Sequence, residues 1–102
     1  MHKFGKGEDP ELKATPQVQE IANKVKKEVE ERLNTQFKKF KAVKFIQQGY
    51  NGINYKIKVE VDRGSYIHLV VEEYFAREGG TKLALDVVTE GKTLSNPLIG
   101  WG

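Results

Sequence analysis

The sequence contains two histidines, His2 and His68, and a histidine is the side chain best suited to proton transfer near neutral pH. The two are not spaced as a metal-binding pair. His68 lies in the middle of a predicted strand, where we interpret it as a partly buried strand residue. Ser65 is its nearest hydroxyl, but Ser65 belongs to a turn, and an odd spacing along a strand sends the two side chains to opposite faces. No nucleophile–base pair is therefore predicted.

Two other groups of residues could in principle support chemistry. Glu72 and Glu73 are neighbours, but adjacent strand residues point to opposite faces, which is poor geometry for an acid–base pair. Gly5-Lys6-Gly7 is not a phosphate loop, because no strand precedes it and no helix begins at the right distance after it. The chain has no cysteine, which excludes disulfides, zinc–thiolate sites and a thiol nucleophile. We predict that the protein is not an enzyme and needs no cofactor or metal.

The composition is that of one small folded domain, residues 1–102. Hydrophobic residues make up 38% of the chain and charged residues 30%, and no apolar run is long enough to span a membrane. The aromatic residues are numerous enough to seed a core. The lack of cysteine and of a visible signal peptide predicts a cytoplasmic protein.

The net charge of +3 comes mainly from one short stretch that contains Lys38, Lys39, Lys41 and Lys44 and no acid. A nucleic-acid binder usually has a broader basic surface with aromatic or arginine side chains directed at bases. We interpret these lysines as the solvated outer face of a strand, where they discourage edge pairing. No nucleic-acid or membrane partner is predicted.

A long helix is the clearest element in the sequence. Thr15 is a good N-cap, and Pro16 suits the first helical position because its missing N–H would have no partner there. Apolar residues follow at steps of three and four and form one stripe along the helix. They are Val18, Ile21, Ala22, Val25, Val29, Leu33 and Phe37. The helix is expected to end between residues 34 and 37.

The rest of the chain predicts antiparallel strands at residues 40–48, 53–61, 66–75 and 83–88. In the second of these, apolar residues alternate strictly with Asn54, Lys56, Lys58 and Glu60, as in a strand with one buried face. Asn51-Gly52 marks the first hairpin, and residues 77–82 form another. Residues 1–14 lack periodicity and are predicted to be a flexible arm, whereas Leu98, Ile99 and Trp101 suggest that the tail docks. The fold class is α+β: one long helix packed across an antiparallel sheet of four to five strands.

One set of segments forms a pattern that covers nearly the whole chain. It includes residues 14–21, 40–43, 66–69 and 83–85 and the ending Leu98-Ile99-Gly100-Trp101. Its most distinctive part is Asn54-Tyr55-Lys56-Ile57-Lys58-Val59. In these segments the sequence resembles the stefins, the cysteine-free branch of the cystatin family, with one apparent extra residue near Gly79-Gly80.

The resemblance implies a cystatin fold and reversible inhibition of papain-like cysteine proteases, such as papain and the cathepsins. Stefins fill the protease cleft with a wedge made of an N-terminal trunk and two hairpin loops. Either Gly5 or Gly7 matches the trunk glycine, and Phe4 precedes Gly5 as an apolar residue that a protease subsite could accept. By this resemblance the protease-binding residues are Phe4, Gly5, Gly7, Gln48, Gly49, Tyr50, Asn51, Gly52, Tyr74, Phe75, Ala76 and Arg77.

Both loops differ from the family pattern. The first loop of stefins reads Gln-X-Val-X-Gly, and here Gln48 and Gly52 match while Tyr50 replaces the valine. The second loop usually carries Leu-Pro, and residues 74–77 lack the proline. One explanation is an inhibitor with altered protease preference. The alternative is a stefin-like scaffold, diverged or engineered, that binds a protein other than a protease.

Aromatic residues at hairpin tips can anchor a protein partner. Tyr50, Tyr74 and Phe75 are candidates, although Tyr74 and Phe75 could equally be strand-end residues with at least one turned into the core. Glycine and asparagine in the first loop accept turn geometry without strain. We therefore predict a monomer with little tendency to exchange strands between chains.

Overall fold

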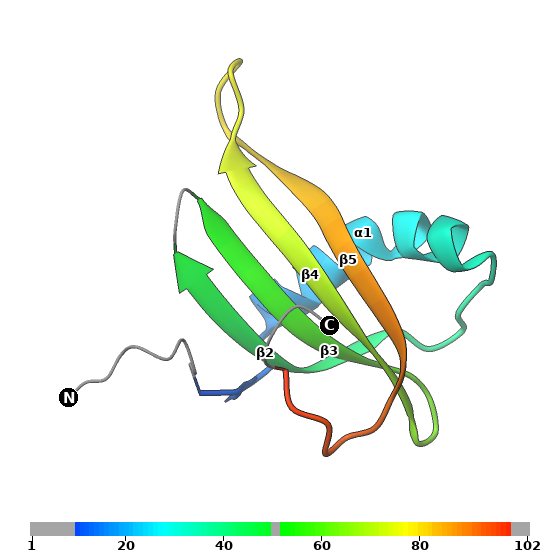
Figure 1. Ribbon diagram of the computed structural model, residues 1–102. Coiled ribbons are helices and arrows are strands. Elements are labelled where there is room, and N and C mark those ends of the chain that lie inside the picture. Colours follow the sequence, from blue (N-terminus) through cyan, green and yellow to red (C-terminus); the bar gives the residue numbers. More distant parts are fainter. Residues whose placement is uncertain (1–9, 50–51, 99–102) are drawn as a thin grey trace.

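A computed structural model describes residues 10–49 and 52–98 of the chain (Figure 1). One α-helix, α1 (Pro16–Leu33), lies across one face of a five-stranded antiparallel sheet. The strands are β1 (Leu12–Lys13), β2 (Lys41–Gly49), β3 (Ile53–Asp62), β4 (Ser65–Phe75) and β5 (Thr81–Lys92). They lie in the sheet in chain order, each hydrogen-bonded to the next. The predicted α+β fold is confirmed, and β5 is longer than the predicted strand at 83–88.

The ends of α1 follow the signals in the sequence. The side chain of Thr15 accepts a hydrogen bond of 3.1 Å from the backbone N–H of Val18, and Pro16 occupies the first turn. Asn34 ends the helix in the left-handed conformation with φ 55°, and its N–H is directed to the carbonyl groups of Glu30 and Glu31. Both predicted ends of the helix are therefore confirmed.

The core lies between the apolar stripe of α1 and the inner face of the sheet. Val29, Ile57, Val59, Leu69 and Val71 are all 0% exposed. Complete burial of such side chains stabilises the fold by about 1.5–3 kcal/mol each. Five residues of the predicted helix stripe are buried, and Leu33 packs against them as a half-buried neighbour. Phe37 was predicted to continue the stripe, but it lies after the end of the helix and packs against the core from there.

The last residues of the predicted N-terminal arm, residues 12–14, are hydrogen-bonded to the edge of the sheet. Leu12 pairs with Phe45 and Lys13 with Lys44, so these two residues form β1 at the edge of the sheet. The Ala14 N–H also donates to the Val43 carbonyl at 3.0 Å. Isolated apolar residues without periodicity gave no signal for this short pairing. The prediction of a flexible arm through residue 14 is wrong for residues 12–14, and residues 1–9 lie outside the described ranges.

The outer face of the sheet, opposite α1, is not the solvated surface that the alternation in β3 predicted. Lys58 is 0% exposed and Lys56 is 7% exposed. His68 on β4, which pairs with Lys58, is also buried. The chain after β5 runs across this face (Figure 1), and Leu98 is buried there, as expected for a tail that docks.

The basic stretch before and within β2 is partly neutralised. Lys39 Nζ lies 3.2 Å from a carboxylate oxygen of Glu60, and Lys44 Nζ lies 3.9 Å from one of Glu11. Such partly exposed pairs contribute little to stability, typically about 0–1 kcal/mol. They do reduce the local positive charge, which agrees with a structural role for these lysines.

Candidate functional site

The antiparallel topology brings the two candidate hairpins and the start of β1 to one end of the sheet. The β2–β3 and β4–β5 connections lie at the same end of the sheet, while the turn between β3 and β4 lies at the other end. Because β1 runs antiparallel to β2, the chain that precedes β1 also enters the sheet from the side of the first two connections. Figure 1 shows the ends of β2 and β4 and the starts of β3 and β5 on this side of the sheet.

The base of the first hairpin is held in regular pairing. Gln48 pairs with Asn54 and Gly49 with Ile53. Tyr50 and Asn51 lie outside the described ranges. Gly52 has φ +114°, a backbone conformation that side-chain-bearing residues rarely adopt, and a Cβ at this position would lie 2.8 Å from the carbonyl oxygen of Glu73. The motif glycine is therefore required where the loop passes close to β4.

The second hairpin ends in a tight turn. Ala76 N–H donates to the Gly80 carbonyl at 3.0 Å, and Gly79 N–H donates to the Ala76 carbonyl at 3.1 Å. Arg77 is exposed at this turn. At the tip, Glu78 and Lys82 form an exposed ion pair of 2.7 Å, and this hydrogen bond lowers the pKa of the Glu78 carboxyl.

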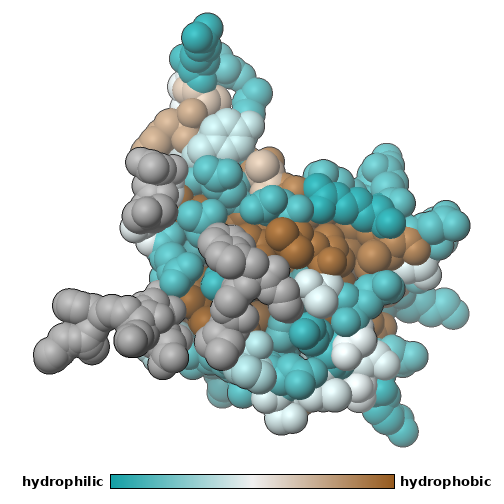
Figure 2. All heavy atoms as spheres, in the orientation of Figure 1, coloured by the Kyte–Doolittle hydropathy of each residue, from teal (hydrophilic) through white to brown (hydrophobic). Residues whose placement is uncertain are grey.

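Aromatic side chains lie just below this tip. Tyr74 is 38% exposed and Phe75 is 83% exposed. Figure 2 shows the polar tip with apolar side chains directly beneath it. The interpretation that at least one of Tyr74 and Phe75 turns into the core is wrong, because the core ends below this part of β4. Phe75 instead presents an apolar ring to solvent.

Glu73 joins the second hairpin to the centre of the sheet. One carboxylate oxygen accepts a hydrogen bond of 3.2 Å from the Tyr55 hydroxyl, and the other accepts one of 3.0 Å from the Thr81 hydroxyl. Burial, followed by the Glu73 charge, raises the pKa of Tyr55, so the phenol stays protonated. Glu73 thus stiffens the base of the hairpin, which is a structural and not a catalytic role.

The described residues form neither a metal-binding cluster nor a membrane-spanning helix. Within residues 10–49 and 52–98, no three or more His, Asp or Glu side chains gather as metal ligands would. The one helix in these ranges is too polar to cross a membrane. The candidate residues of the trunk, Phe4, Gly5 and Gly7, lie outside the described ranges.

The sequence patterns did not predict that Lys58, on the outer face of the sheet, is buried. Burial lowers the pKa of Lys58, and the nearby Lys44 and Lys92 lower it further, whereas Glu11 opposes this shift. In the sequence, Lys58 occupies a polar position of an alternating strand, and such a position does not show that a distant segment covers it.

One helix packed across a five-stranded antiparallel sheet, with its strands in chain order, defines the class of fold. The family model described as "Cystatin domain" matches residues 7–93. Cystatin-A of Felis catus is 41% identical over 88 residues, which cover 86% of this chain and 89% of that protein. This chain belongs to the cystatin family.

Further relatives place it in the stefin branch. Stefin-2 of Mus musculus is 41% identical over 70 residues, covering 69% of this chain and 68% of that protein. The alignment to Cystatin-A1 of Sus scrofa is shorter, at 50% identity over 58 residues, and spans 56% of that protein. Cystatins are protease inhibitors and not enzymes, in agreement with the prediction that this chain has no catalytic function.

Proposed function

We propose that this protein is a reversible inhibitor of papain-like cysteine proteases and that it blocks the active-site cleft with its trunk and two hairpins. The observation that carries the proposal is that both hairpins and the start of β1 lie at one end of a cystatin sheet. We call the start of β1, with the residue before it, the root of the trunk. The proposed contact residues are those of the wedge: Phe4, Gly5, Gly7, Gln48, Gly49, Tyr50, Asn51, Gly52, Tyr74, Phe75, Ala76 and Arg77.

The geometry of the hairpins supports binding by a preformed surface. Gly52 fixes the first loop against β4, and Glu73 ties the second hairpin to β3. Little conformational entropy is then lost when these loops dock. Phe75, being 83% exposed, has apolar area to bury in a protease subsite. The inhibitor offers the protease no catalytic group of its own.

Cytoplasmic location belongs to the same proposal. A chain without cysteine does not depend on an oxidising compartment for its fold. Fractionation of the cells that express it, with antibody detection, checks this location. Recovery of the protein only outside the cytoplasm would contradict it.

We further propose that the protein is a monomer. The first hairpin contains Gly49, Asn51 and Gly52, and Gly52 already adopts positive φ, so closing this turn stores little strain that strand exchange could release. Size-exclusion chromatography after mild heating should give a single monomer peak. A persistent dimer under these conditions would contradict this proposal.

Titration against papain tests the inhibitory function, and Tyr50→Val tests the altered first loop. Valine restores the family pattern Gln-X-Val-X-Gly, whereas tyrosine adds a ring and a hydroxyl that needs a partner once desolvated. We expect the wild type to inhibit papain and Tyr50→Val to inhibit roughly tenfold more tightly.

The wild type and the variant are measured side by side under the same conditions. A variant that inhibits no better than the wild type would reject the idea that tyrosine is merely tolerated. That result favours the alternative, in which the loops serve a protein target other than a protease.

A further inference from the structure

The outer face of the sheet contains a lysine whose ammonium group is fully used inside the protein. Lys58 Nζ donates to the backbone carbonyl oxygens of Thr93, Leu94 and Asn96 at 2.6, 2.7 and 2.6 Å. An ammonium group has three donors, and all three are satisfied here. A buried charge is costly unless it is bonded in this way, so Lys58 holds the chain after β5 against the sheet.

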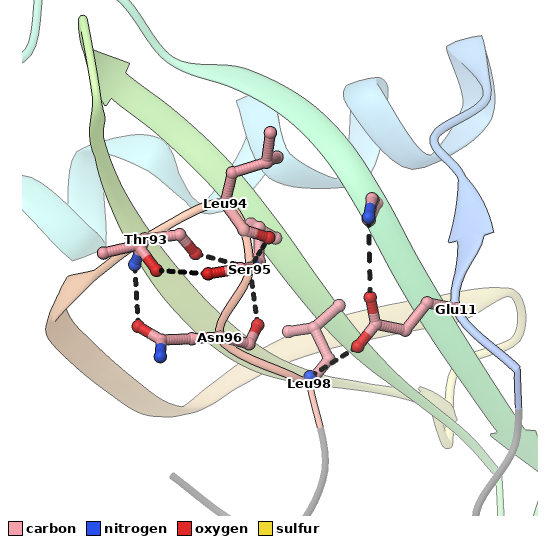
Figure 3. Close-up of polar contacts among 8 residues, drawn as sticks. Glu11, Thr93, Leu94, Ser95, Asn96 and Leu98 are labelled. Atoms are coloured by element: carbon pink, nitrogen blue, oxygen red, sulfur yellow. Dashed lines mark hydrogen bonds and ion pairs between the residues drawn. The ribbon is translucent and has the colours of Figure 1, made fainter.

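The segment that receives Lys58 is itself ordered by local bonds. The Thr93 N–H donates to Asn96 Oδ1 at 2.8 Å, and the Asn96 N–H donates to the Thr93 carbonyl at 3.2 Å. This turn directs its carbonyl groups toward one point, as Figure 3 shows. Two residues further on, the Leu98 side chain is 2% exposed. We call residues 93–98 the C-terminal clasp.

The clasp reaches the point where the N-terminal trunk joins the sheet. The Leu98 N–H donates to Glu11 Oε2 at 2.8 Å, and the other carboxylate oxygen of Glu11 faces Lys44 at 3.9 Å (Figure 3). Glu11 directly precedes β1. Lys58, the clasp and Glu11 therefore form a continuous set of contacts from the centre of the sheet to the root of the trunk.

The strand that holds the trunk root needs such support. β1 has two residues, and among the described strands it pairs only with β2. A pairing this short at the edge of a sheet opens easily, with a local free energy far below that of global unfolding. A second attachment at Glu11 holds the residue before β1 against the clasp and β2.

We propose that the C-terminal clasp positions the inhibitory trunk, with Lys58 and Glu11 as the positioning residues. This inference rests on the proposed function, because the trunk matters only if it enters a protease cleft. Loss of either residue releases the root of the trunk, and the freed segment must then be ordered when the protease binds. Ordering a few additional residues weakens inhibition by roughly tenfold.

Three variants of the full chain test the contacts that run from Lys58 through the clasp to Glu11. Lys58→Met keeps the aliphatic stem but removes the three donors, and Glu11→Ala removes the acceptor for Leu98. Glu11→Gln keeps an acceptor oxygen and loses only the charge, so it should retain most of the wild-type behaviour. Lys41→Met is the matched control for loss of a lysine, because Lys41 is exposed on β2.

The first measurement is amide hydrogen exchange at Ala14, whose N–H is bonded to the Val43 carbonyl in the free protein. We expect exchange to accelerate roughly tenfold in Lys58→Met and Glu11→Ala, and to stay unchanged in Lys41→Met. Unchanged exchange in Glu11→Ala overturns the proposal. Glu11 is partly exposed at the edge of the sheet, so this variant is expected to fold. The measurement needs no protease and holds even if the protein does not inhibit one.

The second measurement is the inhibition constant against papain for the single variants and for the double variant Glu11→Ala/Lys58→Met. If both residues act along one path, the double variant is no weaker than the weaker single variant. Additive losses, or no loss in Glu11→Ala, overturn the positioning role. Absence of inhibition by the wild type rejects the proposed function instead, and the exchange data then report on the clasp alone.

Discussion

Gly52→Ala should lower the free energy of unfolding by about 3 kcal/mol, because the new side chain meets two separate obstacles. The backbone at Gly52 has φ +114°, which is strained for any residue with a Cβ. That Cβ would also lie 2.8 Å from the carbonyl oxygen of Glu73, and backbone atoms in a paired strand cannot move aside easily. The loop must shift away from β4 to relieve the contact, so inhibition of papain should weaken as well.

Gly49→Ala is the matched control for this prediction. Gly49 lies on the other side of the same hairpin, at the end of β2 and outside the positive-φ region, and a Cβ there would have no neighbour within 4 Å. Alanine there should change stability by less than about 1 kcal/mol. Urea unfolding of the wild type and both variants provides the comparison. Equal stability of the two variants would show that the close approach to Glu73 does not constrain the loop.

The helix and the main strands could be predicted because their signals are local. The Thr15-Pro16 start and the apolar stripe each depend on residues within a few positions of one another. The alternation in β3 and the glycines of the hairpins are equally local. Among the elements of the described ranges, β1 was missed, because it has two residues and is defined by its pairing with β2. No periodicity can arise in a segment of that length.

Burial of the outer face could not be predicted, because it depends on contacts between distant segments. Lys58 has the spacing of a solvated strand residue, yet its ammonium group is bonded to carbonyl groups of the chain beyond β5. The long aliphatic stem of lysine allows the same residue to suit either setting. Only the path of the clasp decides between the two.

The candidate site was predictable where a backbone constraint underlies the motif. Gly52 matches the family pattern, and its positive φ and its approach to Glu73 give the physical reason. The exposure of Phe75 was not predictable, since an aromatic residue near the end of a strand can turn either way. Its position depends on where the core ends, which is a property of the whole sheet.

Acid should destabilise the fold through His68, by about 3 kcal/mol between neutral pH and pH 4. Burial first, and then the charges of Lys58 and Lys92, lower the pKa of His68 from 6.5 to about 4, whereas Glu11 opposes the shift. His68 is 5% exposed, and its Nε2 has no hydrogen-bond partner among the described residues. A proton added there would place a charge beside Lys58, its register partner on β3.

The sign of this effect follows from the two pKa values. Above about pH 6.5 the imidazole is neutral in the folded and unfolded chains, so it adds no pH dependence. Between about 6.5 and 4 the unfolded chain binds a proton that the folded chain does not, and stability falls by about 1.4 kcal/mol for each unit of decreasing pH. Below about pH 4 both states are protonated, and no further loss comes from this residue.

His68→Phe and His68→Leu remove the titrating group and fill the same buried position with apolar atoms. Urea unfolding from about pH 7 to about pH 4.5 should show a flatter dependence in both variants than in the wild type. The difference between the curves isolates His68, because the carboxylates that also titrate in acid are common to all the proteins. His2→Gln removes the other imidazole of the chain and serves as the control for histidine loss in general. Parallel curves for the wild type and both His68 variants would show that this buried imidazole does not govern the acid response.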